Sequence, residues 1–251
     1  MTDRAGSVTG GNGGLAGAAP NSRGVIEGAF LLLDTLREAG EAGLSQLARE
    51  TGLPKASVHR LLRQLCDLGA VEQREGRYCI GPHLFWLGQS WRPDSALMAA
   101  TRSPLQRLAQ ATGASIGLGV WAHGQATIVR GVPGEVATRV QMGPGLVWPW
   151  CTAAAKVLLA WDSPSRRGRD GGLTAQEAEE IRRNRVAFDR EEVLPGVACV
   201  AVPIMHPAKD VPIAVLAALV EPAQSLSRLA ELLHRTGDNV TSSLPALGKG
   251  A

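Results

Sequence analysis

The sequence feature that most constrains the fold is a short break, Gly52-Leu53-Pro54, between two amphipathic segments. Glycine supplies the positive φ that ends many helices, and proline fits the first turn of the helix that follows. We therefore predict one helix over residues 44–51 and another over 55–68, which Gly69 ends. Apolar residues at helical spacing between Val25 and Gly40 predict an earlier helix.

A β-hairpin is predicted directly after these helices. Two short runs, 70–73 and 77–80, flank the charged turn Arg74-Glu75-Gly76, and this arrangement is typical of a hairpin. Three helices and a hairpin in this order form a winged helix-turn-helix, whose last helix enters the major groove of DNA. Gly81-Pro82 then interrupts the pattern, and residues 83–91 are predicted to form a connecting helix.

The predicted helix over 55–68 has a basic exposed side. From Pro54 to Arg63 the chain carries three lysine or arginine residues and no acidic residue. We expect Ser57 and His59 to reach base edges. We expect phosphate contacts from basic side chains of the helix and the hairpin, namely Lys55, Arg60, Arg63, Arg74 and Arg77. The alternative interpretation is a small helical bundle with a solvated basic face.

The second half of the sequence mixes helical and strand periods. Thr174 and Glu177 predict a capping box at the start of one helix. Predicted hairpins outnumber crossovers, so we expect an α/β fold of the α+β type with a mainly antiparallel sheet. The predicted helices cover 97–111, 152–161, 173–186 and 222–244, and the predicted strands cover 114–122, 125–132, 197–204 and 213–220.

Composition limits the other function classes. The chain has 251 residues, a formal net charge of +3 and four cysteines without a C-x-x-C pair. No cysteines or histidines have zinc-ligand spacing, so we expect no metal and no cofactor. Residues 1–22 are rich in glycine and alanine and are expected to form a disordered tail. We see no signal peptide and no membrane-spanning run, which predicts a cytoplasmic protein without a membrane partner.

Several segments resemble the IclR family of bacterial transcriptional regulators. Residues 43–62 read GLSQLARETGLPKASVHRLL and resemble its helix-turn-helix. The resemblance extends over about residues 23–248. Its other matches are Gly76-Arg77-Tyr78 and Ile80-Gly81-Pro82 at the wing, 152–160 at a pocket helix, and 189–192 with 196–203 at a central strand.

The resemblance implies a domain order and a set of partners. The expected domains are a winged helix-turn-helix over 23–82, a linker helix over 83–93 and a GAF-like effector-binding domain over 94–248. Family members typically act as dimers or tetramers on palindromic operators. The expected partners are therefore double-stranded DNA with an inverted repeat, a small organic effector and further copies of the same chain.

The resemblance also implies an effector site, between the sheet and the start of the 152–161 helix. Helix N-termini offer free N–H groups to a ligand, and small side chains let it approach. Where the family has small polar residues, often serines, the sequence has Ala218 and Val220, so the expected effector has low polarity. The expected contacts are Thr152, Ala153, Ala154, Asp189, Cys199, Ala218, Val220 and Trp148.

Some of these residues have structural alternatives. Trp148 and Trp150 are equally consistent with an aromatic pocket wall and with an oligomer interface. In the alternative interpretation, Cys199 is an ordinary core residue and Asp189 caps the local backbone, and neither contacts an effector.

Two other function classes are alternatives to a ligand-controlled regulator, namely a thiol-based sensor and an enzyme. A thiol-based redox or electrophile sensor on the same DNA-binding scaffold would use Cys151 or Cys199. An enzyme is not expected, because the sequence lacks a nucleophile elbow, a Gly-rich phosphate loop and a plausible triad. We therefore assign no catalytic residues.

Overall fold

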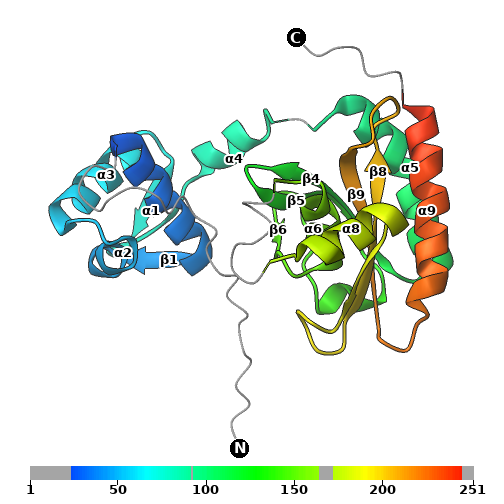
Figure 1. Ribbon diagram of the computed structural model, residues 1–251. Coiled ribbons are helices and arrows are strands. Elements are labelled where there is room, and N and C mark those ends of the chain that lie inside the picture. Colours follow the sequence, from blue (N-terminus) through cyan, green and yellow to red (C-terminus); the bar gives the residue numbers. More distant parts are fainter. Residues whose placement is uncertain (1–23, 92, 164–171, 245–251) are drawn as a thin grey trace, which may run out of the picture. The chain divides into compact units, whose positions relative to one another are not determined.

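The computed structural model describes residues 24–91, 93–163 and 172–244. The chain divides into two compact units, which meet in sequence between residues 92 and 93 (Figure 1). The predicted tail over 1–22 lies outside the described residues. None of the described helices is long and apolar enough to cross a membrane.

The N-terminal unit combines helices with a small antiparallel sheet. The predicted break is confirmed, because Gly52 ends one helix with a φ of 67° and Pro54 precedes the next. Its elements are α1 (Val25–Ala39), β1 (Glu41–Gly43), α2 (Leu44–Thr51), α3 (Lys55–Asp67), β2 (Val71–Arg74), β3 (Arg77–Ile80) and α4 (Pro82–Gly88).

The predicted hairpin is part of a three-stranded sheet of order β1-β3-β2. The additional strand β1 lies between α1 and α2, and its Ala42 pairs with Tyr78 of β3. Three residues are too few to show an alternating pattern, so the sequence does not predict β1. Its pairing ties the helices to the wing through a shared core, whose fully buried members are Leu32, Leu36, Ala42, Leu47, Val58 and Leu62.

The C-terminal unit is built on an antiparallel sheet of order β6-β5-β4-β9-β8-β7, which confirms the predicted α+β class. Its strands are β4 (Ser115–Ala122), β5 (Gln125–Val132), β6 (Val147–Trp148), β7 (Ala187–Arg190), β8 (Ala198–Met205) and β9 (Pro212–Val220). Its helices are α5 (Ser95–Thr112), the 3-10 turn η1 (Glu135–Thr138), α6 (Ala153–Ala160), α8 (Ala175–Asn184) and α9 (Leu226–Ser243).

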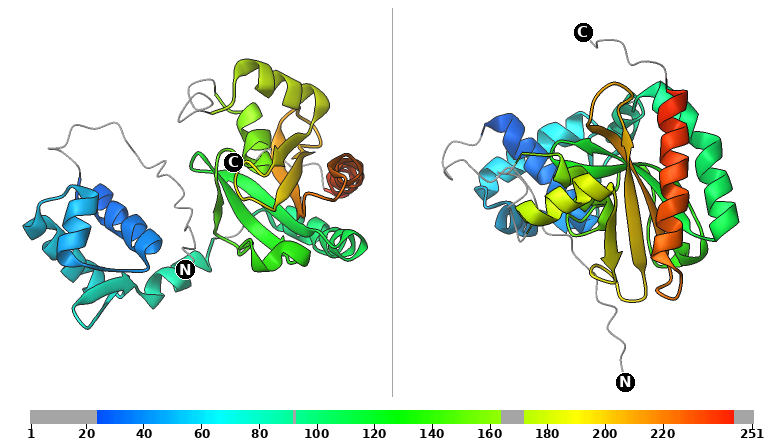
Figure 2. Two further views of the ribbon diagram at one scale, coloured as in Figure 1. Left: turned by 90° about the horizontal axis from the view of Figure 1, so that it is seen from below. Right: turned by 45° about the vertical axis from the view of Figure 1, so that its right-hand side comes forward.

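Helices cover both faces of this sheet. The pair α5 and α9 covers one face, and α6 with α8 covers the other (Figure 2). Successive strand residues point to opposite faces. On β8, for example, Val200 belongs to the α5/α9 core and its neighbours Cys199 and Ala201 belong to the α6 core.

Two helix boundaries in this unit follow from capping. The predicted capping box is confirmed, since the side chains of Thr174 and Glu177 each bind the other's backbone N–H. The last helix begins at Leu226 rather than at the predicted Pro222. Ser225 is its N-cap, and its side chain accepts a hydrogen bond from the N–H of Arg228. Serine is a favoured N-cap residue because its side chain satisfies a free backbone N–H, so the helix starts after Ser225 and not at Pro222.

Trp148 packs onto a strip of glycine in the centre of the sheet. It comes from β6 at the sheet edge, and its side chain is 7% exposed. A Cβ atom built on Gly119 would lie 2.4 Å from Cζ3 of Trp148, and one built on Gly117 would lie 2.5 Å from its Cζ2. Both glycines belong to β4. Only residues without a side chain allow the indole to lie this close to the strand.

This packing predicts a specific pairwise coupling. We expect Gly119→Ala to lower the free energy of unfolding by about 1–3 kcal/mol, because the added methyl group overpacks the space under the indole. In a Trp148→Ala background the same substitution is expected to cost less than half as much. Urea unfolding of the two single variants and the double variant measures the coupling. Equal costs in both backgrounds would show that the indole does not depend on Gly119.

Candidate DNA-binding surface and effector site

The exposed side of α3 is basic, as predicted. Val58, Leu61, Leu62 and Leu65 are buried, and Lys55, His59, Arg60, Arg63 and Gln64 are exposed. Side chains advance by about 100° per residue around a helix. Arg60 and Arg63 therefore lie near the middle of the exposed side, opposite the buried residues.

Ser57 and His59 lie on different borders of that exposed side. His59 is exposed and falls on the same border as Lys55, four residues earlier. Ser57 is half-buried and falls on the other border. The structure thus separates the two residues that were predicted together for base contacts, and it places the arginines between them.

The two wing arginines are held by acidic neighbours. The guanidinium of Arg74 lies 2.6 Å from the carboxylate of Glu72, two residues earlier on the same strand. Arg77 lies 3.7 Å from the carboxylate of Glu41 and donates a hydrogen bond of 2.8 Å to its carbonyl oxygen. All four side chains are substantially exposed, and exposed ion pairs contribute little to stability. A phosphate can therefore compete for either arginine.

At the start of α6, the predicted contact Thr152 is used by the fold itself. Its Oγ1 accepts a hydrogen bond from the N–H of Ala155 at 3.2 Å and donates one to the carbonyl of Pro149 at 2.8 Å. Ala153 and Ala154 are fully buried in the core between α6 and the sheet. The N–H groups in the first turn of a helix have no intrahelical acceptor. These two residues therefore offer backbone donors beside methyl groups.

Asp189 and Cys199 are cross-strand neighbours on β7 and β8. Asp189 is 4% exposed, and its Oδ1 accepts a hydrogen bond of 2.8 Å from the N–H of Glu192. Burial raises the pKa of the Asp189 carboxyl, and the hydrogen bond from Glu192 offsets part of this effect. Lys156 of α6 forms an ion pair with Glu192. The structure thus brings a buried acid, a thiol and a lysine to the α6 face.

The prediction that Ala218 and Val220 line this site is wrong. Both side chains lie in the core between the sheet and α5/α9, on the face away from α6. Their neighbours Ala217 and Leu219 point toward α6 instead. A shift of one residue along a strand moves each side chain to the other face. Ala217 and Leu219 are also apolar, so the expectation of low polarity for this face stays a prediction.

Of the two predicted tryptophans, only Trp148 lies in the interior. Trp150 is 43% exposed, whereas Trp148 is buried on the α6 face of the sheet. Trp121 of β4, which is not among the predicted contacts, packs on the same face. Trp121 alternates with Gly117 and Gly119 in the sequence, and residues two apart on a strand share a face. This spacing was the sequence signal that places Trp121 on the same face as the two glycines. The indole Nε1 of Trp121 is buried and has no hydrogen-bond partner among the described residues.

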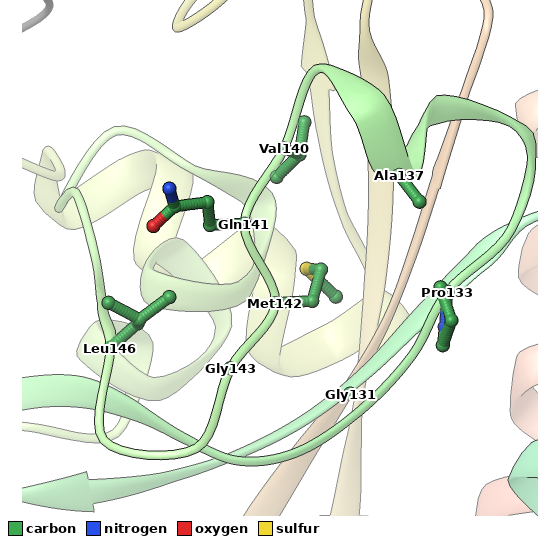
Figure 3. A pocket seen from close by; sticks show the side chains of 8 residues that line it. All are labelled: Gly131, Pro133, Ala137, Val140, Gln141, Met142, Gly143 and Leu146. Carbon is green, nitrogen blue, oxygen red and sulfur yellow. The ribbon is translucent and has the colours of Figure 1, made fainter.

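A pocket of about 390 Å³ opens beside this core, and none of the predicted contacts lines it. It lies between the end of β5 and the loop that leads to β6 (Figure 3). Its lining residues are Gly131, Pro133, Ala137, Val140, Gln141, Met142, Gly143 and Leu146.

Burial works against a thiolate at either cysteine of the C-terminal unit. Cys199 is buried, and this burial strongly raises the pKa of its thiol. Burial also raises the pKa of the Cys151 thiol. A protonated thiol is a poor nucleophile. Within residues 24–91, 93–163 and 172–244, no group of three or more His, Cys, Asp or Glu side chains could hold a metal ion.

Comparison with known proteins identifies both units. The IclR helix-turn-helix domain matches residues 25–75, which include α1, α2, α3 and the first strand of the wing, β2. The C-terminal domain of the bacterial transcriptional regulator IclR matches residues 173–241. A crystal structure named for an IclR transcriptional regulator from Silicibacter sp. TM1040 is 25% identical and covers 88% of this chain and 100% of its own, with a TM-score of 0.70.

Two further proteins are similar over most of their length. The glycerol operon regulatory protein of Streptomyces griseus is 34% identical over 64% of this chain and 70% of its own length. An IclR homologue from Microbacterium hydrocarbonoxydans, crystallised with 4-hydroxybenzoate, shares the fold at 19% identity, with a TM-score of 0.67, and covers 88% of this chain and 99% of its own. The chain therefore belongs to the IclR family of bacterial transcriptional regulators.

Proposed function

We propose that this regulator binds an inverted-repeat operator through α3 and the wing, and that a small organic effector in the C-terminal unit changes its affinity for DNA. The observation that carries the first part is the exposed side of α3. It presents Lys55, His59, Arg60 and Arg63, and the chain has no acidic residue from Pro54 to Cys66. By contrast, α1 exposes acidic side chains, namely Glu27, Asp34 and Glu38.

The position of each basic side chain suggests its task on DNA. Arg60 and Arg63 lie in the middle of the exposed side, from which a helix in the major groove reaches both base edges and phosphates. Arg74 and Arg77 in the wing would exchange their acidic partners for backbone phosphates. The base contacts of Ser57 and His59 remain a prediction, and they would be made from opposite borders of the helix.

We expect Arg63→Ala to weaken binding to DNA of any sequence. Removing one phosphate contact lowers the slope of log affinity against log salt concentration by about 0.9. Fluorescence anisotropy with a random-sequence duplex, recorded over a range of salt concentrations, measures both effects.

Arg235→Ala is the matched control for this experiment. Arg235 is an exposed arginine on α9, and its loss changes the net charge by the same amount. The control should leave the salt dependence unchanged. If both variants lost the same affinity, binding would follow net charge and not the surface of α3.

An inverted repeat requires two copies of the reading helix, and the N-terminal unit has apolar surface that suits self-association. Two groups of side chains are more than half exposed, Val25, Ile26 and Phe30 on α1 and Phe85, Trp86 and Leu87 on α4. Exposed apolar side chains concentrated in this way mark interaction sites. We propose that these residues meet their counterparts in a second copy of the chain.

Trp86→Ser tests this assembly. Trp86 is 63% exposed, so its loss should leave the fold intact and shift the mass measured by light scattering toward that of a single chain. Val211→Ser, which removes an exposed apolar residue from the C-terminal unit, is expected to leave the mass unchanged. If the double variant Trp86→Ser/Phe30→Ser kept the wild-type mass, this surface would be ruled out as the site of self-association.

The effector part of the proposal is supported by the start of α6. Backbone donors of Ala153 and Ala154, the Cys199–Asp189 pair and the aromatic side chain of Trp148 meet on one face of the sheet. Lys156 adds a positive charge nearby. The similar fold of a protein crystallised with 4-hydroxybenzoate is in line with a small organic ligand at this type of domain.

A thiol sensor requires a reactive cysteine, whereas the burial of Cys199 predicts an unreactive one. We expect Cys199 in the folded chain to react with iodoacetamide at least about tenfold more slowly than in urea, because its thiol is buried and protonated. Its reaction should still accelerate with pH above about 8.5, the ordinary pKa of cysteine. Mass spectrometry of the labelled peptide measures both. Rapid labelling of native Cys199 near neutral pH would favour the sensor.

A further inference from the structure

We propose that Trp148 is a plug in the effector site, and that an effector binds only when the indole leaves its place between β4 and α6. This inference rests on the proposed effector control. It also specifies the ligand, which should be a planar aromatic molecule that carries a hydrogen-bond acceptor.

The floor of the site is shaped for a flat ring. Trp148 starts on the edge strand β6 and reaches across β5 to β4, where its six-membered ring lies on Gly117 and Gly119. The residue of β5 that pairs with Trp148 is Ala126, which is buried on the same face. Glycine and alanine thus form a smooth surface in the centre of the sheet. Such a surface accepts any flat apolar ring and is not shaped for one particular side chain.

The roof of the site is equally small. Ala153, Ala154 and Ala155 form the first turn of α6 and are buried in the same core as Trp148. Methyl groups cannot fill the gap to the sheet, so a larger group must occupy it. We infer that this group is the indole, which lies on Gly117 and Gly119 and belongs to the same core. If the indole moved out, the floor and the roof would remain, because β4 and α6 belong to the main framework of the unit.

Trp121 supplies the polar feature. It pairs with Ala126, which in turn pairs with Trp148, so the two tryptophans flank this alanine on one face. The Nε1–H of Trp121 is buried and has no partner among the described residues. A buried donor without an acceptor destabilises the folded state, because it has lost its hydrogen bond to water. A ligand with an acceptor atom at this point would remove that destabilisation, which the indole of Trp148 cannot do because its nitrogen is a donor.

The strand that carries the plug is weakly attached. β6 has only two residues, which pair with Ala126 and Thr127 of β5. Two further backbone hydrogen bonds join Gly145 and Leu146, directly before β6, to Ile128 of β5. Val147 of β6 is exposed. Movement of β6 would break these bonds at the sheet edge and leave the pairing of the other strands in place.

The pocket in Figure 3 is a natural entrance to the site. Met142 lines that pocket, and its Cε also lies 2.6 Å from a Cβ atom built on Gly117. Met142 thus separates the open pocket from the indole on the glycine floor. Methionine is flexible and adapts its shape readily, so it can yield to a ligand that enters from this side.

Binding of indole to the full chain and to Trp148→Ala tests the plug. Truncation should open a slot for a flat ring, and apolar cavities of this kind bind small aromatic molecules. We expect indole, measured by isothermal titration calorimetry, to bind Trp148→Ala at least tenfold more tightly than it binds the wild type. Trp150→Ala removes an exposed tryptophan and is expected to behave as the wild type. A folded Trp148→Ala variant with wild-type affinity for indole would overturn the proposal.

A conservative variant keeps the test decisive. If Trp148→Ala fails to fold, Trp148→Leu retains more apolar volume and is expected to bind indole more tightly than the wild type, by a smaller factor. Wild-type affinity in a folded Trp148→Leu variant would then overturn the proposal.

The role of Trp121 is tested in the Trp148→Ala background. Trp121→Phe removes the Nε1–H and keeps an aromatic ring. It should weaken the binding of 4-hydroxybenzoate, which carries acceptors, by about fivefold, and leave the binding of indole unchanged. Equal losses for both probes would assign Trp121 a packing role only.

Binding of wild-type protein to DNA is measured separately and without a probe. DNA binding together with no gain for either truncated variant would refute the plug and leave the regulator intact. If folded protein failed to bind DNA both in this measurement and with aromatic probes present, the proposed function would be refuted, and the titrations would still report directly on the site.

Discussion

The C-terminal unit depends on the contact between Trp148 and the two glycines of β4. This contact links the edge of the six-stranded sheet to its centre, within the same core that buries the alanines of α6. On the opposite face, larger aliphatic side chains from α5 and α9 pack against Val200, Leu216 and their neighbours. Both faces of the sheet are therefore packed cores, and the α6 face differs in that a tryptophan ring lies directly on a strip of glycine.

The extent to which the sequence predicts this structure varies with the strength of local signals. Gly52 and Pro54 set the boundaries of α2 and α3, because each has a strong backbone preference at a helix end. β1 and β6 were beyond prediction, since strands of three and two residues carry no measurable alternation. Their positions depend on pairing with strands far away in sequence.

The error in the site prediction has a similar cause. β9 is apolar at nearly every position, so its sequence does not show which residues face α6. The assignment of Ala218 and Val220 was therefore off by one residue. Trp121 was missed for a different reason, because the alternation of Gly117, Gly119 and Trp121 becomes meaningful only once another element is known to cover that face.

In the N-terminal unit, electrostatics and packing divide α3 into two sides. Leucines and a valine fix the helix against α1 and α2, and the arginines project outward without an acidic neighbour in the same stretch. The most direct test of DNA recognition is selection from a random pool of double-stranded DNA at about 0.15 M salt, where nonspecific binding is weak. The proposed function predicts enrichment of a short inverted repeat. Folded protein that enriches no sequence, alone or with aromatic probes present, would contradict it.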